Sequence, residues 1–370
     1  EIYTLSLHDA LPICQVGDSI SPALCHHLHI PVVEVAHLTD QPQGLRLGGA
    51  VVAEAHALHH AGDDCVDSAD AGGPDVLVRA HTPMVAGWSP PRTLSPMRIA
   101  TINVNGIRAA ARKGMGHWLT ACAPDVLLLQ EVRADEVTAA SLLPGYTAVT
   151  WPCRVKGRAG VSVAVHENSA VGMGELRRGV SPAGATEPDV DSGRWLEADL
   201  ELPSGQMITV VSAYLHSGQV GTEKMDQKYA HLALVGNRLT ELLDSAAQGG
   251  PQVLMAGDFN IVRSPQDITN WKPNHNKHAG VLDEEIAHLE SWFTAGWTDI
   301  VRHLAPQEQG PYTWWSQRGR AFENNTGWRI DYQMTTPELA ARAISFKVDR
   351  AASRETRFSD HAPLVVDYDD

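Results

Sequence analysis

Polar side chains suited to phosphate chemistry follow several short apolar runs of this sequence, at the point where each run ends. A folded scaffold presents such strand-end residues to a site. The six clusters are Asn103-Val104-Asn105-Gly106, Gln130-Glu131, Tyr214-Leu215-His216, Gly257-Asp258-Phe259-Asn260, Gly327-Trp328-Arg329-Ile330-Asp331-Tyr332 and Ser359-Asp360-His361-Ala362-Pro363. Hydrolysis of a phosphate ester needs an activated water and positive charge near the phosphate, and oxygen ligands suit magnesium. The clusters therefore predict a metal-assisted hydrolytic site.

Metal binding is expected of the carboxylates first. Glu131 ends a buried apolar run, where a carboxylate has few other reasons to occur, so we expect it to bind the metal. Asp360 offers a second carboxylate, while Asn103 and Asn105 offer neutral contacts to metal and phosphate. The full candidate set of ligands for Mg²⁺, with Mn²⁺ as the second choice, is Asn103, Asn105, Glu131, Asp258, Asn260, Asp360 and His361.

The chemical step is expected of Tyr214, Asp258, Asn260, Asp331 and His361. Asp258 is the candidate to orient or deprotonate the attacking water, and Asn260 faces the same side because it lies two residues further along an extended segment. Asp331 would raise the basicity of the His361 imidazole, so that the ring binds a phosphate oxygen as a cation. Tyr214 would hydrogen-bond the phosphate or assist the leaving oxygen. The residue that activates water and the one that assists the leaving group stay open alternatives.

The elements that must position these residues are short strands mixed with a few helices. Runs rich in Val, Ile and Leu predict buried strands at residues 98–103, 125–130, 160–165, 195–202, 207–216, 252–258, 328–335, 343–348 and 364–367. Apolar spacings of three and four predict helices at residues 115–123, 225–246 and 283–295. Strands and helices without strict alternation favour two packed sheets with helices outside. We expect residues 97–370 to form one domain.

Residues 1–96 have a different composition. They contain no Lys, Asn or Phe but nine of the 18 His, and their 11 acidic residues against three Arg give a net charge of −8. The chain carries −15 in total, which leaves −7 for residues 97–370. Because regular patterning begins at Met97, we expect residues 1–96 to be disordered or a non-native N-terminal extension from a wrongly assigned start codon. The alternative is a zinc or nickel site formed by residues of Cys25-His26-His27-Leu28-His29 together with His56, His59 and His60.

The overall composition limits the class of protein. A net charge of −15 argues against a general basic nucleic-acid binder but allows an enzyme with a carboxylate-rich metal cleft. The five cysteines show neither metal-binding spacing nor a paired framework, which favours a reduced, cytoplasmic protein. No apolar run approaches the roughly 20 residues needed to cross a bilayer. We expect a monomer that does not enter a membrane.

In order and spacing, the six clusters resemble the endonuclease/exonuclease/phosphatase superfamily, and more narrowly its exonuclease III branch of abasic-site (AP) endonucleases. The resemblance extends from Met97 to about Tyr368. It implies an α/β fold of the DNase I-like type, a four-layered α/β sandwich of two packed mixed sheets flanked by helices. It also implies a DNA repair nuclease with Asp258 as the catalytic aspartate. The expected activities are magnesium-dependent cleavage of DNA on the 5′ side of abasic sites and 3′-to-5′ exonuclease action on double-stranded DNA.

The resemblance also implies how DNA is bound. Trp314, Trp328 and Ile330 would form an apolar slot for a flipped deoxyribose that lacks its base, from which a normal nucleotide is excluded by size. Backbone contacts are expected from local positive charge. The candidates are Arg108, Lys113, Lys156 and Lys277. The family pattern usually has Asn where His275 and His278 stand, so the phosphate contacts of these two histidines are left open.

Two other classes of protein fit parts of the pattern. A phosphatase of the same superfamily, acting on a small phosphorylated molecule or a lipid, would share the Asn, Glu, Asp-x-Asn and Asp-His parts but would lack the aromatic slot. A catalytically dead binding protein would have lost Glu131, Asp258 or His361, and all three are present.

Overall fold

The structure, a computed structural model, describes residues 96–181 and 186–369. Residues 1–95 lie outside the described residues. The expectations for that segment, including a metal site among its histidines, are therefore not tested by the structure. No helix in the described part of the chain has the length and apolar composition needed to cross a membrane.

Two six-stranded sheets form the centre of the described residues. The first sheet has the spatial order β11 (Ala343–Val348), β12 (Leu364–Tyr368), β1 (Met97–Asn103), β2 (Val126–Gln130), β4 (Val161–His166) and β3 (Tyr146–Trp151). The second has the order β5 (Gly172–Arg178), β6 (Trp195–Glu201), β7 (Met207–Tyr214), β8 (Gln252–Asp258), β10 (Asp331–Thr335) and β9 (Thr298–Asp299). Both are mixed sheets, because β1 pairs in parallel with β2, and β7 with β8, beside antiparallel neighbours.

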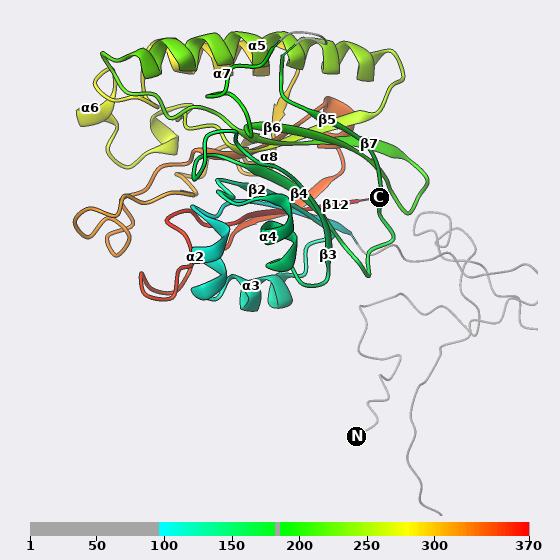
Figure 1. Cartoon of the computed structure of the whole chain (residues 1–370). Coiled ribbons are helices and arrows are strands. Elements are labelled where there is room, and N and C mark those ends of the chain that lie inside the picture. Colours follow the sequence, from blue (N-terminus) through cyan, green and yellow to red (C-terminus); the bar gives the residue numbers. More distant parts are fainter. Residues whose placement is uncertain (1–95, 182–185, 370) are drawn as a thin grey trace, which may run out of the picture. The chain divides into compact units, whose positions relative to one another are not determined.

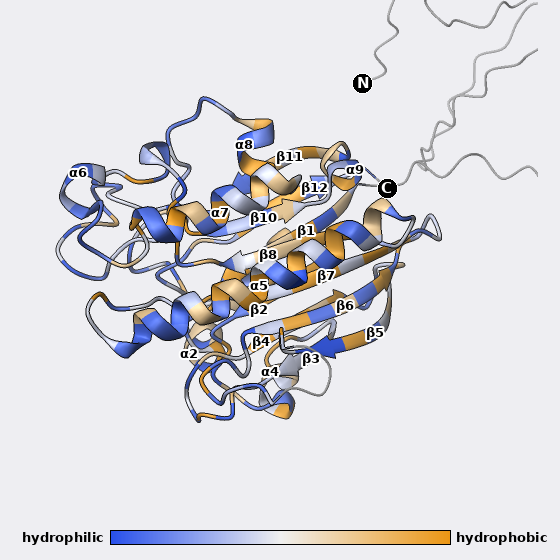
Figure 2. Ribbon diagram, turned by 90° about the horizontal axis from the view of Figure 1, so that it is seen from above, coloured by the Kyte–Doolittle hydropathy of each residue, from blue (hydrophilic) through white to orange (hydrophobic). Residues whose placement is uncertain are grey.

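Helices cover the outer face of each sheet, which gives four layers (Figure 1). The first sheet carries α2 (Ile107–Arg112), α3 (Met115–Cys122) and α4 (Glu136–Ser141). The second carries α5 (Glu223–Ala247) and α7 (Asp283–Ala295), which lie beside each other across its strands in Figure 2. Shorter helices are a 3₁₀ turn at Pro265–Asp267, α6 (Trp271–Asn274), α8 (Ile300–Leu304) and α9 (Pro337–Ala340). The predicted four-layered α/β sandwich is confirmed.

Strand alternation decides which side chains reach the space between the sheets. On β1, Met97 and Ile99 pack in the core between the sheets, whereas Ala100 and Ile102 pack against the helices. The same period of two points Asn103 toward the second sheet. On β8, Leu254 and Ala256 likewise belong to the core between the sheets, so Asp258 faces the same space. The two sheets therefore present Asn103 and Asp258 to each other at the ends of their central strands.

A buried polar layer separates the apolar core from that end of the sandwich. The Gln130 side chain accepts from Thr101 Oγ1 at 3.2 Å and donates to Ser212 Oγ at 3.1 Å, which links β1, β2 and β7. Gln333 Nε2 donates to the backbone oxygens of Ile99 and Leu364. Because Gln130 and Gln333 have these partners, the core can become polar toward the site without leaving their amide groups unpaired.

The structure differs from the sequence predictions in several elements. The strand predicted at residues 328–335 begins only at Asp331, because Trp328 leaves the ladder and forms isolated bridges to Ile268 and Trp314. The strand predicted to reach residue 216 ends at Tyr214. Three strands, β3, β5 and β9, were not predicted, nor were α2, α4, α6, α8 and α9. The helix predicted at residues 283–295 has those bounds in the structure.

Candidate active site

A cleft of about 500 Å³ lies at the end of the sandwich where β1, β2, β7 and β8 finish. It collects residues from all six of the predicted clusters. Its lining residues are Asn105, Glu131, Arg133, Tyr214, Ser217, Gly218, Asp258, Asn260, Ala279, Trp314, Trp328, Ile330, Asp360 and His361. Segments more than 250 residues apart in sequence therefore meet at one place, because each directly follows or precedes a strand at this end of the sandwich.

Glu131 is held by groups from β1, from β7 and from the segment that follows β2. Its Oε1 accepts from Asn103 Nδ2 at 3.0 Å and from the Tyr214 hydroxyl at 2.7 Å, and Arg133 pairs with its other oxygen. Burial, followed by the neighbouring charges of Glu131 and Asp258, raises the pKa of Tyr214 well above its usual value, so the hydroxyl is a proton donor. Glu131 has a φ of 50°, a left-handed conformation that is unfavourable for Glu. The fold keeps this strained residue at the cleft.

Asp258 is almost fully buried and receives three hydrogen bonds. Asn103 Nδ2 donates to its Oδ2 at 2.9 Å, the Asn260 backbone N–H to its Oδ1 at 2.9 Å, and Asn260 Nδ2 to its Oδ2 at 3.2 Å. Burial, together with the carboxylates of Asp331 and Glu131, raises the pKa of Asp258 although His361 opposes this. A carboxylate with a raised pKa at the cleft floor is suited to accept a proton from water.

Asp331 and His361 form the predicted carboxylate–imidazole pair. His361 Nδ1 lies 2.9 Å from Asp331 Oδ2, and its Nε2 lies 3.8 Å from Asp258 Oδ2. Burial alone would lower the pKa of His361, but the carboxylates of Asp331 and Asp258 raise it. At neutral pH the ring is therefore an imidazolium that exposes Nε2 to the cleft.

Asp360 belongs to the same network on its other side. Its Oδ1 accepts from Asn105 Nδ2 at 2.8 Å and its Oδ2 from Trp314 Nε1 at 3.3 Å. The Asn105 backbone N–H donates to Asn103 Oδ1 at 2.9 Å. Burial opposes ionisation of Asp360, but the charge of His361 and the hydrogen bond from Asn105 lower its pKa. Asn103 and Asn105 thus connect Asp360 to Glu131 and Asp258.

The donor atoms of the cleft suit a hard divalent cation. Carboxylate oxygens of Glu131, Asp258 and Asp360 and the amide oxygens beside them surround one cavity, and hard cations prefer oxygen ligands. Atoms of Asp258, Asp331 and His361 also lie within 4.8 Å of one another, and Asp331 Oδ1 is buried without a hydrogen-bond partner. His361 also lines the cleft, and its place in the predicted ligand set stays a prediction. The oxygen ligands fit magnesium.

The aromatic residues predicted to form a slot stand together at one wall of the cleft. Trp314 and Trp328 form a β-bridge, and their rings meet edge to face with centroids 5.5 Å apart. Ile330 packs in the same small apolar cluster. Between Trp328 and Ile330, the fully buried Arg329 points the other way and binds Asp267 and Asp299. This buried ion cluster fixes the backbone that presents both slot residues.

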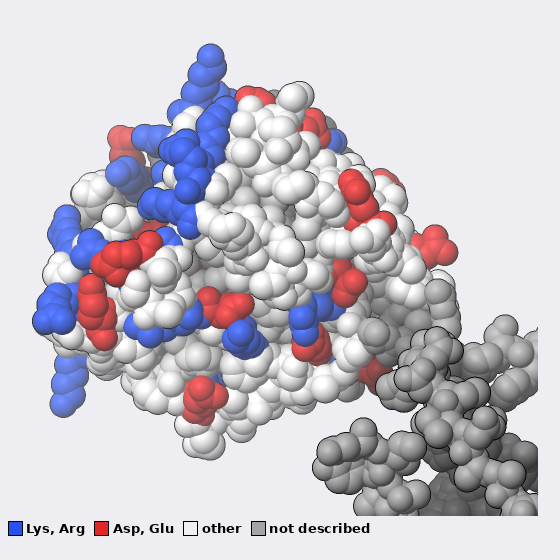
Figure 3. All heavy atoms as spheres, turned by 90° about the horizontal axis from the view of Figure 1, so that it is seen from below, with Lys and Arg blue, Asp and Glu red and all other residues white. Residues whose placement is uncertain are grey.

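The four cations predicted to contact DNA lie on the surface and do not line the cleft. Arg108, Lys113, Lys156 and Lys277 are all exposed. Arg108 has an acidic neighbour, with its guanidinium 3.6 Å from Asp135. Figure 3 shows the molecule from below, where Lys and Arg side chains gather on the side on which α2 and α6 lie in Figure 1.

Sequence reasoning missed several residues that shape the site. Arg133, two residues after Glu131, lines the cleft and neutralises that carboxylate. Thr313 Oγ1 accepts from the backbone N–H groups of Ile330 and Asp331, at 3.1 Å each. Lys228 is fully buried on α5, where the apolar spacing of the helix calls for a hydrophobic residue. The sequence therefore does mark Lys228, because a lysine at an apolar position of a helix indicates a buried charge.

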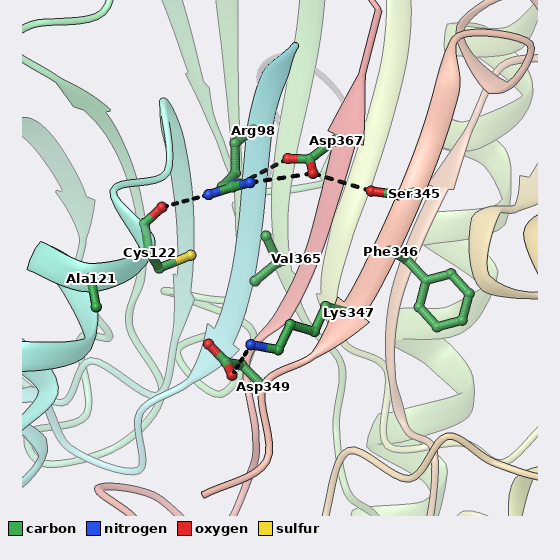
Figure 4. Close-up of a pocket in the computed structure, with 9 residues that line it drawn as sticks. All are labelled: Arg98, Ala121, Cys122, Ser345, Phe346, Lys347, Asp349, Val365 and Asp367. Atoms are coloured by element: carbon green, nitrogen blue, oxygen red, sulfur yellow. Dashed lines mark hydrogen bonds and ion pairs between the residues drawn. The ribbon is translucent and has the colours of Figure 1, made fainter. Parts of the chain in front are cut away.

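A second cavity of about 510 Å³ lies beside β1, β11 and β12, away from the strand ends that form the cleft (Figure 4). Arg98 at the start of β1 pairs with Asp367 and donates to the Cys122 carbonyl, while Lys347 pairs with Asp349 at 2.8 Å. Its charged groups are thus satisfied by one another. This cavity offers no unpaired charge to a ligand.

The two packed sheets and the carboxylate-rich cleft define a metal-dependent phosphodiester hydrolase. A family model confirms this class: residues 100–361 match the Endonuclease/Exonuclease/phosphatase family, and the chain belongs to that family. The match covers the segment in which all six clusters lie.

Relatives and solved structures are similar over the same part of the chain. The exodeoxyribonuclease of Bacillus subtilis is 29% identical over 272 residues, which cover 73% of this chain and 98% of that protein. Exodeoxyribonuclease III of Haemophilus influenzae is 26% identical over 278 residues, or 74% of this chain and 100% of that protein. An AP endonuclease from Archaeoglobus fulgidus superposes with a TM-score of 0.61 at 26% identity, covering 74% of this chain and 100% of that one. A 3′ phosphatase from Neisseria, solved with a product DNA hairpin, gives 0.62 at 26% identity, covering 74% and 99%.

Proposed function

We propose that this protein is a magnesium-dependent DNA repair nuclease that hydrolyses the phosphodiester on the 5′ side of abasic sites and removes nucleotides from 3′ ends of double-stranded DNA. The observation that carries the proposal is the position of the aromatic slot: Trp314 and Trp328 line the same cleft as Asp258 and His361. The slot distinguishes a nuclease for abasic DNA from a phosphatase for small molecules. The names of the relatives support the same assignment.

In this proposal the metal is held by Glu131 and Asp360, with Asn103 beside them. A bound divalent cation would supply positive charge to the scissile phosphate. Asn103 and Asn105 fix the orientation of these carboxylates through the hydrogen bonds described above. Mn²⁺ would serve in place of Mg²⁺, because the ligands are oxygen atoms.

Asp258 is the residue proposed to orient and deprotonate the attacking water, and Asn260 holds its carboxylate in place. The His361 imidazolium, kept charged by Asp331, would bind a phosphate oxygen and stabilise the negative charge of the transition state. The Tyr214 hydroxyl, a proton donor at neutral pH, would assist the leaving oxygen.

The DNA partner would lie across the basic side of the molecule. Arg108, Lys113, Lys156 and Lys277 are proposed to contact backbone phosphates, which position the duplex without reading its sequence. A flipped abasic deoxyribose would enter between Trp314, Trp328 and Ile330, because it pays less to leave the duplex than a paired nucleotide. Residues 97–370 would suffice for activity, as a monomer in the cytoplasm.

The test uses the full chain, a duplex oligonucleotide with one stable abasic analogue, and gel resolution of the products with Mg²⁺ or EDTA. We expect a single cut on the 5′ side of the lesion that requires the metal and is lost in Asp258→Asn. Asp226→Asn, an exposed position on α5, serves as the matched control and should leave the cut unchanged. A protein that starts at Met97 should cut at the same rate, and a loss of activity would show that residues 1–96 are needed.

Two substrates in the same assay separate the alternatives. A duplex with a 3′ phosphate tests the activity named for the Neisseria structure. Phosphate release from inositol phosphates or a lipid, without any cut in the abasic duplex, would move the protein to the phosphatase branch and overturn the proposed substrate class.

A further inference from the structure

A fully buried ion pair lies behind the cleft, outside the residues that line it. Lys228 on α5 and Glu285 on α7 both have no exposed side-chain surface, and Lys228 Nζ lies 2.5 Å from Glu285 Oε1. The two helices that carry them lie beside each other over the second sheet (Figure 2). Removing two charges from water is costly, and a well-packed apolar pair at such a place is often as stable. Stability alone is therefore a weak reason for this pair.

The sequence of α5 makes Lys228 exceptional. The buried face of the helix otherwise carries mainly apolar residues at spacings of three and four, among them Met225, Leu232, Val235 and Leu239. Lys228 occupies the place in this series between Met225 and Leu232. The lysine thus replaces an apolar contact with a buried charge.

The ammonium group of Lys228 binds backbone on two sides of the cleft. Its Nζ donates to the Asn260 carbonyl at 3.0 Å and to the Ser217 carbonyl at 3.4 Å. Asn260 has a φ of 51°, and in this left-handed conformation its backbone N–H and its amide both donate to Asp258. Ser217 follows Tyr214 by three residues and lines the cleft. One side chain therefore fixes the segments that carry Asp258 and Tyr214.

Glu285 extends the same contact to the wall of the slot. Its Oε2 accepts from the Gly280 N–H at 2.6 Å and from the Leu282 N–H at 3.1 Å. Gly280 packs so tightly that an added Cβ would lie 3.0 Å from the Asn260 oxygen and 3.2 Å from the Trp328 ring. Its neighbour Ala279 lines the cleft. The carboxylate therefore holds the backbone that separates Asn260 from Trp328.

We propose that Lys228 and Glu285 act as positioning residues, which hold Asn260, and through it Asp258, in the geometry required for metal and phosphate binding. This inference rests on the proposed nuclease function for its kinetic test. It assigns neither residue any contact with the substrate. The pair acts through the backbone carbonyl of Asn260 and the backbone N–H of Gly280.

The test compares Lys228→Met, the double variant Lys228→Met/Glu285→Gln, and Lys224→Met as the matched control, since Lys224 is an exposed lysine one turn away on α5. In Lys228→Met the remaining carboxylate is buried without its partner, so the variant loses stability. The double variant leaves no buried charge and should recover most of that stability. A merely structural pair would then recover its activity as well. We expect instead that the folded double variant keeps a kcat about 100-fold below that of the natural protein, with a KM for abasic duplex changed less than about threefold. Recovery of kcat in the folded double variant would overturn the inference.

A second readout does not depend on DNA cleavage. Calorimetric titration with Mn²⁺ should show affinity weakened about tenfold in the double variant and unchanged in Lys224→Met, because a displaced Asp258–Asn260 segment disturbs the oxygen ligands. If the natural protein binds Mn²⁺ but does not cut abasic DNA, the proposed function fails while this titration still tests the pair. Equal Mn²⁺ affinity in both proteins would overturn the inference.

If the double variant does not fold, the single variant Glu285→Gln is compared with Lys228→Met instead. The glutamine oxygen still accepts from Gly280 and Leu282, and Lys228 still reaches both carbonyls. We expect its kcat to stay within about threefold of the natural value while Lys228→Met falls about 100-fold. An equal loss in the two single variants would show that charge pairing, and not the hold on Asn260, matters, and would overturn the inference.

Discussion

Asp331 and Asp258 are register partners on the antiparallel strands β10 and β8, so the fold sets two buried carboxylates directly beside each other. Two neighbouring carboxylates repel each other when both are ionised, unless a cation lies close to both. His361 supplies that cation, with Nδ1 2.9 Å from Asp331 and Nε2 3.8 Å from Asp258. Burial is the main cause of the raised pKa of Asp258, and the register adds the neighbouring Asp331 carboxylate to it. The same two carboxylates raise the pKa of His361.

The first prediction concerns this pair. Because the Asp331 carboxylate raises the pKa of His361, the imidazolium is present at neutral pH and is lost only as the pH rises through its raised pKa. Asp331→Asn should lower kcat at neutral pH about 100-fold and shift the alkaline limb of the kcat–pH profile to lower pH. Steady-state kinetics across the alkaline range checks this. An alkaline limb that stays in place would show that another group titrates there.

The second prediction concerns the aromatic slot. Trp328→Ala should lower kcat/KM for incision at an abasic site about tenfold, because the apolar wall that packs against the flipped sugar is lost. Exonuclease action on an undamaged duplex should change far less. Trp118→Ala, which removes a half-buried tryptophan from α3, should leave the ratio of the two activities unchanged. Equal losses of both activities in Trp328→Ala would mean that the residue supports the fold and not the choice of substrate.

Sequence alone predicts the centre of the fold better than its borders. Strands such as β2 and β8 are buried on both faces, so most of their residues are apolar and the sequence shows an almost continuous apolar run. The missed strands β3, β5 and β9 each lie at an edge of a sheet, where fewer residues need to be apolar. In β5, no residue is buried. An edge strand of this kind carries no local signal that separates it from a loop.

The candidate site was predictable for the residues that follow strands, and less so for the residues that hold them. Asp258 and Glu131 end apolar runs, which marks them in the sequence. Arg329 is buried by partners 30 and 62 residues away, at Asp299 and Asp267, and nothing local indicates that contact. Its burial is a product of tertiary structure, whereas the position of Lys228 on the apolar face of α5 can be read from the helix spacing.

The third prediction concerns the backbone before Asp258. Gly257 has a φ of 145°, and an added Cβ would lie 1.9 Å from the Ala213 carbonyl oxygen on β7. Gly257→Ala must therefore separate β7 from β8, and we expect a loss of at least about 3 kcal/mol in the free energy of unfolding. Gly249→Ala is the control, since its φ is 91° but no atom lies within 4 Å of the added Cβ. It should cost about 1 kcal/mol. Urea denaturation measures both, and equal losses would contradict the steric argument.

The fourth prediction concerns the ion cluster behind the slot. Arg329→Met leaves Asp267 and Asp299 buried without their shared guanidinium, so the free energy of unfolding should fall by about 3 to 5 kcal/mol. Lys347 also pairs with an aspartate, Asp349, but its side chain is 71% exposed. Lys347→Met should therefore change stability by less than about 0.5 kcal/mol. Chemical denaturation at neutral pH compares the two. A small effect in Arg329→Met would mean that Arg302, which pairs with Asp267, and Arg263, which lies 3.6 Å from Asp299, compensate for the lost guanidinium.

The last prediction concerns acid stability and the buried ring of His231 on α5. Neither ring nitrogen of His231 has a hydrogen-bond partner, and the ring packs edge to face against His216 with centroids 5.1 Å apart. Burial, followed by the neighbouring His216, lowers the pKa of His231 from 6.5 to about 3. Between these two values the unfolded chain binds a proton that the folded protein does not, so stability is full above the upper value and falls as the pH falls below it.

His231→Leu removes this titration while keeping an apolar side chain on the buried face. The natural protein should lose about 1.4 kcal/mol per pH unit from this residue within the window, which amounts to about 2 kcal/mol between about pH 6.5 and about pH 5. The difference in unfolding free energy between about pH 7.5 and about pH 5 should therefore be smaller in the variant by that amount. Urea denaturation of both proteins at the two pH values measures this double difference, in which the contributions of titrating groups distant from His231 cancel. If the unfolding free energy falls equally in the two proteins, His231 has the same pKa in the folded and the unfolded chain, and the prediction is wrong.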